Sequence, residues 1–382
     1  MSLENIIKKV EEEVQVFEEK LEGFEGDVEK LTSLLTKIIK NLLILSNSDV
    51  YEKIVKEYTE LMREGEVIYA NEMLVATLER PVRYAFTIEK SKQSKKSIEN
   101  VIEDIVKKKI SKFNFDNELV DKIVKIVIEN EEPLTLICKA IDDSYLNALR
   151  ELIANYIRIT PYWKNYFSYI PGLTDYRVGY LITIAPPWRF NKFSAYRLYI
   201  GSAPRKVYQI LGKHWHRKAK SIFYITFLLS LKNHNPYYKK IFSLRFDVNK
   251  MKILDEYVRE TYNKSINELK DSEVEKLLKW FEISTDNKAK ILRSKTFFYA
   301  LKESVDIFAH HFWYITRKSL GLSVQKPYPI EYLKHEPYYK PAIGIPLDEL
   351  VRKGIKPPAT IIKKGRKDVV FVDVDTGELI HI

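Results

Sequence analysis

The chain has 382 residues, with 63 Lys or Arg against 52 Asp or Glu and a formal net charge of +11. This length predicts two or three domains, and the absence of a run of about 18 apolar residues or of a signal-peptide pattern predicts a soluble intracellular protein. The single cysteine, Cys138, excludes an internal disulfide framework and a thiolate zinc cluster.

Residues 1–80 are predicted to form a coiled-coil or helical region. Apolar residues between Ile7 and Leu42 alternate in steps of three and four, which places one apolar seam along a helix. The partner helix is either another part of this chain or a second copy, so a homodimer through Ile7–Leu42 is one expectation. Helices are expected at Tyr51–Glu64 and at Glu66–Leu78, the second ending before Pro81.

Residues 81–160 are expected to be helical as well. The lysine-rich stretch Lys90–Lys112 is typical of an exposed basic helix, and Leu134–Ile159 is periodic and ends before Pro161.

Residues 161–246 have a different character, because the 71 residues between Asp175 and Asp247 contain no acid and 14 Lys or Arg. The residues outside this window therefore have a formal net charge of −3. A long block of one sign raises the local potential and attracts polyanions, nucleic acid above all. A basic surface that serves only solubility is the plainer alternative.

The remaining chain divides into residues 247–325, a helical insertion followed by a helix, and residues 326–382, a Pro- and Tyr-rich tail. Helices are predicted at Asp271–Phe281 and Phe297–Leu320. Val369–Ile380 alternates around Asp375-Thr376-Gly377 and predicts a small β-hairpin. The expected fold is therefore mainly α-helical.

A Pro-Gly turn opens the basic window. Ile170-Pro171-Gly172-Leu173-Thr174 precedes a predicted helix at Tyr176–Ile184, in the pattern of a helix-hairpin-helix. In that motif glycine allows a tight turn, and the N–H groups at the following helix start face a phosphate. Such contacts hold the DNA backbone without reading its sequence. A plain turn between helices explains the same residues.

This stretch resembles the C-terminal domain of the IS110/IS116/IS902 transposase family over about 75 residues. The resemblance rests on the Ile-Pro-Gly-Leu start, Arg189-Phe190 with Phe193-Ser194, and Tyr199-Ile200-Gly201-Ser202-Ala203-Pro204. It continues through His216-Arg217-Lys218 and Asn235-Pro236-Tyr237-Tyr238-Lys239.

The resemblance implies a DNA recombinase whose chemistry uses an N-terminal RuvC-like domain with acidic metal ligands and a serine nucleophile. This sequence departs on both counts, because residues 1–160 predict helices only and Ile210-Leu211-Gly212 stands where the family's Ser-Gly would fall. Ser202 and Ser221 are out of register. The heptads agree with the family's coiled coil.

Other residues suggest metal chemistry less directly. Asp373-x-Asp375 is similar to the first strand of a nuclease site that holds Mg²⁺, although an Asp-Thr-Gly turn explains both residues. His214-x-His216 and His310-His311 are weak metal candidates, since adjacent helical residues point in different directions. No metal or other cofactor is expected unless the nuclease alternative holds.

The sequence therefore predicts a DNA-binding protein related to that family and lacking its own catalytic site. An active recombinase or nuclease using Asp373 and Asp375, or an RNA-binding protein, is the alternative. We expect a cytoplasmic, nucleoid-associated protein from a thermophilic prokaryote or its mobile element, with no membrane partner. Trp188 is either a base-stacking or a core residue. The residues expected to contact nucleic acid are Gly172, Thr174, Arg177, Arg189, Arg205, Lys206, Lys213, Arg217, Lys218 and Lys220.

Overall fold

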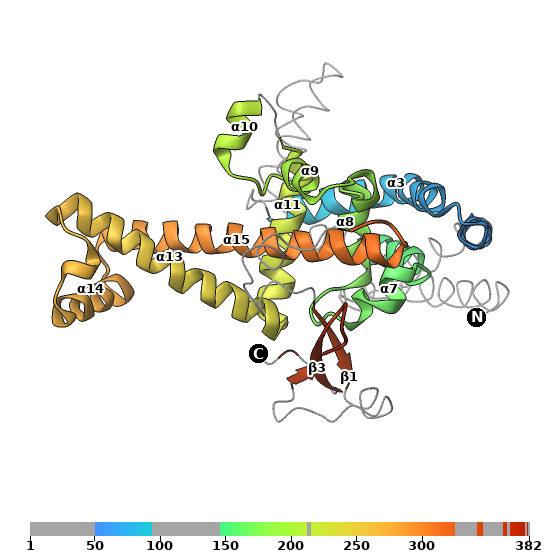
Figure 1. Cartoon of the computed structure of the whole chain (residues 1–382). Coiled ribbons are helices and arrows are strands. Elements are labelled where there is room, and N and C mark those ends of the chain that lie inside the picture. The colour runs from blue at the N-terminus through green and yellow to red at the C-terminus, as the bar shows by residue number, and fades with distance from the viewer. Residues whose placement is uncertain are drawn as a thin grey trace, which may run out of the picture. The chain divides into compact units, whose positions relative to one another are not determined.

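A computed structural model of the chain describes residues 50–93, 146–211, 215–324, 342–346, 362–364, 367–378 and 380. The chain divides into two compact units, unit 1 (Met1–Tyr156) and unit 2 (Ile157–Ile382). The described part of both is mainly helical, as the apolar periodicity predicts (Figure 1).

Unit 1 contains a helix at residues 50–64, then α3 (Val67–Gln93), and residues 146–156, which are helical. The expectation that the second helix ends before Pro81 is wrong, because α3 continues through Pro81. Its apolar stripe runs on past the proline, with Leu78, Val82 and Ala85 all buried. This packing offsets the cost of an interior proline, which is about 3 kcal/mol.

Unit 2 is built around one long helix, α15 (Asn287–Ser319). The preceding helices and turns are α7 (Pro161–Asn165), η2 (Phe167–Tyr169), α8 (Asp175–Ile184), η3 (Pro187–Arg189), α9 (Phe193–Tyr199), α10 (Arg205–Leu211), α11 (Arg217–Thr226), the π-helical η4 (Phe227–Leu231), α12 (Lys232–His234), α13 (Pro236–Tyr262), η5 (Ile266–Glu268) and α14 (Asp271–Ile283). The C-terminal half of α15 is buried almost residue by residue from Ser304 to Arg317. An all-round buried helix is the centre of a domain.

The N-terminal half of α15 pairs with α13, and α14 packs across the far end of the pair (Figure 1). Ile253, Leu254, Ile266, Phe281 and Leu292 form a small core at this end. α14 confirms the helix predicted at Asp271–Phe281. The expected division at 246/247 falls inside α13, which is continuous there.

The helix predicted at Phe297–Leu320 begins ten residues earlier than expected, at Asn287. The carboxylate of Asp286 accepts a hydrogen bond from the N–H of Ala289 at 3.4 Å and caps this start. Its first turns are polar and lysine-rich, so the apolar period that identifies a helix becomes clear only after them.

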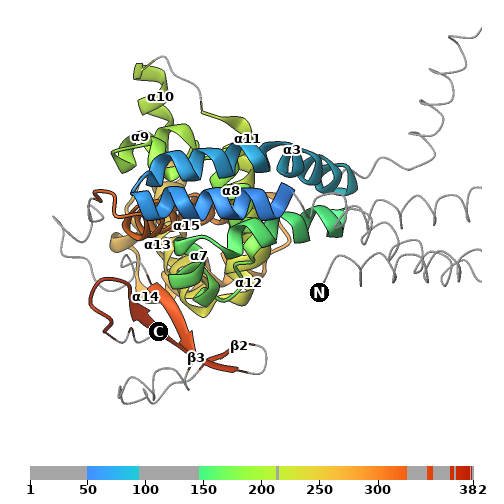
Figure 2. The same ribbon diagram turned by 90° about the vertical axis from the view of Figure 1, so that its right-hand side faces the viewer.

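The C-terminal region forms a three-stranded antiparallel sheet instead of an isolated hairpin (Figure 2). Its central strand β3 (Lys367–Asp373) lies between β1 (Ala342–Pro346) and β2 (Ile362–Lys364), with Ala342 opposite Asp373 and Ile362 opposite Val369. The predicted turn is present, since the N–H of Ile380 still bonds to the carbonyl of Phe371 at 2.8 Å. A hairpin alone is marginal in water, and the two added strands complete the sheet.

Several expectations lie outside the described residues. These are the Ile7–Leu42 coiled coil and its dimer, the basic helix at Lys90–Lys112 beyond Gln93, Cys138, Lys213, His214, and the tail at 326–341.

Candidate nucleic-acid interface

The predicted hairpin turn faces the interior of unit 2. Gly172 has a φ of +83°, and a Cβ at this position would lie 2.7 Å from the backbone carbonyl oxygen of Ser230. The side-chain amide of Asn235 donates to the carbonyl of Pro171 at 3.0 Å, while its oxygen accepts from the N–H of Tyr238. The glycine is therefore needed for close packing against η4.

The start of α8 is already occupied by a carboxylate. Asp175 lies in the first turn and pairs with Arg158 at 2.6 Å. Thr174 is exposed, but its side chain makes no capping hydrogen bond. Because Asp175 and a phosphate would compete for the same positive helix end, this terminus is a poor anion site.

The structure also removes Arg177 from the expected contact set. Its side chain is 6% exposed, and its guanidinium carbon lies 5.2 Å from the ring centre of Tyr176 and 5.6 Å from that of Tyr180. Trp188 is 3% exposed and belongs to the core, which decides between the two roles considered for it. Arg189, by contrast, is exposed.

The start of α11 has the opposite character. His216 caps it, with Nδ1 accepting from the N–H of Ala219 at 3.1 Å, and the first turn contains no acid. Arg217 and Lys218 are exposed in that turn, and neither makes an ion pair or hydrogen bond to any residue that the structure describes. Two free cations thus flank a helix end whose own dipole is positive.

Aromatic rings contact His216 and Lys220, which belong to the same helix start. The rings of Tyr199 and His216 are stacked, with centres 5.0 Å apart and an angle of 9°. Trp215 is 36% exposed, and the Nζ of Lys220 lies 4.8 Å from its ring centre. We call this surface the basic strip. Its members are Arg189, Tyr199, Trp215, His216, Arg217, Lys218 and Lys220.

The titratable rings of the basic strip respond to its positive charge. Burial lowers the pKa of His216, and the neighbouring charge of Lys218 lowers it further. Burial raises the pKa of Tyr199, and Arg189 partly offsets this. A neutral His216 is consistent with its cap, because only an unprotonated Nδ1 accepts a hydrogen bond.

In the folded chain, carboxylates from outside the acid-free window pair with some of its cations. Arg197 forms a bidentate pair with Asp306 on α15, through Nε at 2.8 Å and Nη2 at 2.6 Å. Arg245 pairs with Glu303 on the same helix, at 3.8 Å. Two of the 14 cations are therefore neutralised by a helix far along the chain, and sequence analysis missed both.

The remaining serines and cations of the motif differ in their exposure and in whether the structure describes their side chains. Ser202 is 1% exposed and its hydroxyl donates to Asp306 at 2.6 Å, whereas Ser221 is exposed on α11. The backbones of Arg205 and Lys206 lie in α10, but their side chains are outside the described part of the structure.

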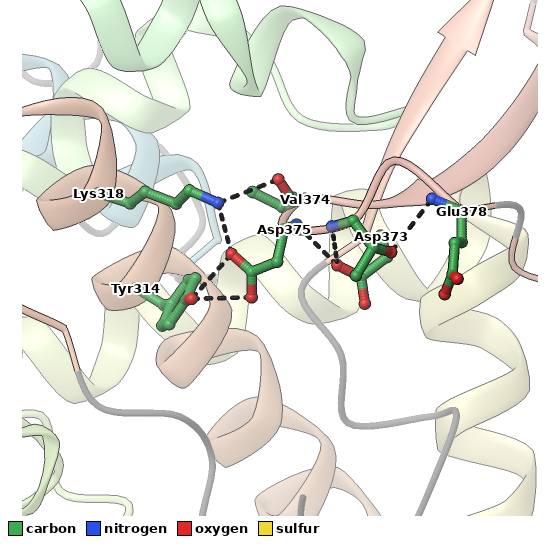
Figure 3. Close-up of polar contacts among 7 residues, drawn as sticks. Tyr314, Lys318, Asp373, Val374, Asp375 and Glu378 are labelled. Atoms are coloured by element: carbon green, nitrogen blue, oxygen red, sulfur yellow. Dashed lines mark hydrogen bonds and ion pairs between the residues drawn. The ribbon is translucent and has the colours of Figure 1, made fainter.

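The two carboxylates considered for a nuclease site hold the C-terminal turn in place (Figure 3). Asp373 accepts the N–H groups of Asp375 and Thr376 through Oδ1, at 2.6 and 3.1 Å. Both oxygens of Asp375 accept from the hydroxyl of Tyr314 at 2.8 Å, and Lys318 donates to the same carboxylate. Each carboxylate therefore makes hydrogen bonds that stabilise the fold, and those of Asp375 attach the turn to α15.

The histidine pair on α15 is buried. His310 packs edge-on against Phe193, with ring centres 4.3 Å apart, and the Nδ1 of His311 lies 3.0 Å from the hydroxyl of Tyr238. Among the described residues, no group of three or more His, Cys, Asp or Glu side chains is placed to hold a metal ion.

Comparison of the chain with protein families, with characterised proteins and with solved structures finds no match in any of the three. In the part of the chain that the structure describes, no helix is both long and apolar enough to cross a membrane.

Proposed function

We propose that the chain binds nucleic acid through the basic strip, and that its ligand is duplex DNA. The observation that carries this proposal is the exposed pair Arg217 and Lys218, which occupy an acid-free helix start without ion-pair partners in the described structure. Unpaired cations on a surface are available to neutralise phosphates and release their counterions.

The contacts would be to the backbone. A phosphate at the start of α11 would accept free N–H groups of the first turn and the charges of Arg217 and Lys218. Trp215 adds an aromatic face on which an unpaired base could stack. Such an interface holds a strand without reading its sequence, so we propose weak sequence preference.

The resemblance to the IS110-type C-terminal domain favours DNA over RNA as the ligand. Its motif residues serve different purposes in this chain: the Pro-Gly turn is internal, and His216-Arg217-Lys218 forms the exposed helix start. The proposal assigns no catalytic step to the chain. A recombinase or nuclease that uses Asp373 and Asp375 remains the alternative, and Mg²⁺ would be its cofactor.

The test is a binding titration with duplex DNA, single-stranded DNA and structured RNA, with and without Mg²⁺, over a series of salt concentrations. The variant is the double substitution Arg217→Ala and Lys218→Ala. Its control is Lys276→Ala with Lys279→Ala, two exposed cations on α14. We expect the slope of log K against log salt to become less steep by about 2 in the first variant only.

Equal binding by the two double variants would refute the role of the basic strip. A preference for single strands or structured RNA would replace DNA as the ligand while retaining the interface. Magnesium-dependent cleavage that is lost in Asp373→Asn would overturn the inert-binder proposal and support the nuclease alternative.

A further inference from the structure

A cleft of about 490 Å³ opens beside the basic strip, between α9, α13 and α15. Its volume lies within the usual range for a small-ligand site. The polar side chains that line it are Arg197, Ser202, Arg245, Asn249, Tyr299, Lys302, Glu303 and Asp306.

Most charges in this cleft are matched within the protein. The guanidinium of Arg197 is held by Asp306 on two sides. Glu303 is shared between Arg245, at 3.8 Å, and the side-chain amide of Asn249, at 3.1 Å. Three cations thus meet two carboxylates, which leaves the lining with a net charge of +1.

The third positive charge of the lining belongs to Lys302. Its side chain is half-buried, and no hydrogen bond or ion pair joins it to another residue in the described part of the chain. Burial lowers the pKa of Lys302, the charges of Arg197 and Lys220 lower it further, and the charges of Asp306 and Glu303 offset this only in part. A partly desolvated ammonium that no carboxylate contacts directly is unfavourable, and an anion from outside would relieve it.

Phosphate is the anion that this geometry fits. The ammonium of Lys302 supplies a mobile point charge, and the guanidinium of Arg245, which pairs with Glu303 at 3.8 Å, is a second cation in the lining. The hydroxyl of Tyr299, which is 45% exposed, adds a neutral donor at the rim.

We infer that this cleft binds one phosphate group, with Lys302 as its principal charged contact and Arg245 as the second. The group belongs either to a nucleic-acid backbone that continues from the basic strip or to a small phosphate compound. For the backbone source the inference rests on the proposed function, whereas for a small phosphate compound it stands independently.

The experiment compares four forms of the full chain by isothermal titration calorimetry. Lys302→Met removes the charge but keeps an unbranched apolar stem, and Lys276→Met does the same on exposed α14. Glu303→Gln removes one negative charge from the cleft. The fourth form is unsubstituted. Inorganic phosphate is titrated into each, and a duplex oligonucleotide is titrated in parallel.

We expect Lys302→Met to weaken phosphate binding by about tenfold or more, as loss of a charge-assisted hydrogen bond does, and Lys276→Met to leave it unchanged. Glu303→Gln should tighten it severalfold, since the net charge of the lining rises to +2. A gain of affinity cannot arise from misfolding, so this variant keeps the test decisive if Lys302→Met is unstable.

The oligonucleotide arm identifies the source. Weaker oligonucleotide binding by Lys302→Met, together with weaker phosphate binding, assigns the cleft to the nucleic-acid backbone. Unchanged or absent oligonucleotide binding, with phosphate binding lost, assigns it to a small phosphate compound even if the proposed function fails. Equal phosphate affinity in Lys302→Met and Lys276→Met, or no phosphate binding by the unsubstituted chain, overturns the inference.

Discussion

His311 makes the folded protein sensitive to acid. Its side chain is 1% exposed, in the buried C-terminal half of α15, and its Nδ1 lies 3.0 Å from the hydroxyl of Tyr238. Burial lowers the pKa of His311 from 6.5 to about 3, and the nearby charge of Asp373 opposes this only in part. Protonating the folded state therefore requires a buried positive charge.

The direction and the size of the effect follow from proton linkage. The unfolded chain takes up a proton at His311 as the pH falls through 6.5, but the folded chain does not until about pH 3. Stability from this residue is complete above pH 6.5 and is lost as the pH falls toward 3. Each unit within that window costs about 1.4 kcal/mol, so acidification to pH 4.5 costs about 2.7 kcal/mol.

The assay is urea denaturation of the native chain and of His311→Gln at pH 7 and pH 4.5. Glutamine keeps a hydrogen-bonding group near Tyr238 but does not titrate. We expect the native chain to lose about 2.7 kcal/mol more than the variant between the two pH values, a large share of a typical folding free energy. Parallel losses in the two proteins would refute the assignment, because all other groups titrate in both.

Three further predictions concern the structure of unit 2, two of them with a matched control substitution. Gly172→Ala should destabilise the fold by about 2–4 kcal/mol, because it adds a backbone clash to the strain of a left-handed conformation. Its control, Gly321→Ala, has open space around it and should cost about 1 kcal/mol; thermal unfolding measures both. Arg317→Met should cost about 3 kcal/mol, since Arg317 is 3% exposed and its guanidinium donates to three backbone carbonyls of the 187–190 segment. Its control, Arg259→Met, removes an exposed ion pair and should change stability by less than about 0.5 kcal/mol. Asp375→Asn should increase hydrogen exchange in the C-terminal turn without altering nucleic-acid affinity, and a lost affinity would contradict its structural role.

Local signals were sufficient for elements whose boundaries are marked nearby. α8 and α14 begin and end within about two residues of the predicted positions, because the apolar spacing of each helix is clear along its length. α3 was misjudged at Pro81, where burial of residues on either side outweighed the proline. The start of α15 was missed although Asp286 is an ordinary capping residue, since no apolar face followed it at once.

The candidate site was less predictable, because its electrostatics depend on contacts between distant parts of the chain. Arg197 and Asp306 are 109 positions apart, and the pair exists only because α9 packs on α15. The charge count of the basic window predicted the exposed cations of α11 but could not separate them from Arg177, whose burial is set by tertiary packing.

The distribution of partners among the cations is itself an argument for a binding surface. The partly buried guanidinium of Arg197 receives a carboxylate from α15, and buried Arg177 lies against two rings, so charges that folding takes out of water are compensated. Within the described part of the chain, Arg217 and Lys218 have no ion-pair partner, and they lie on an acid-free helix start, where a single nearby carboxylate would have lowered the local potential. Folding stability alone does not require cations to be kept away from carboxylates, since an exposed ion pair stabilises the fold slightly. A surface that must attract an anion requires it.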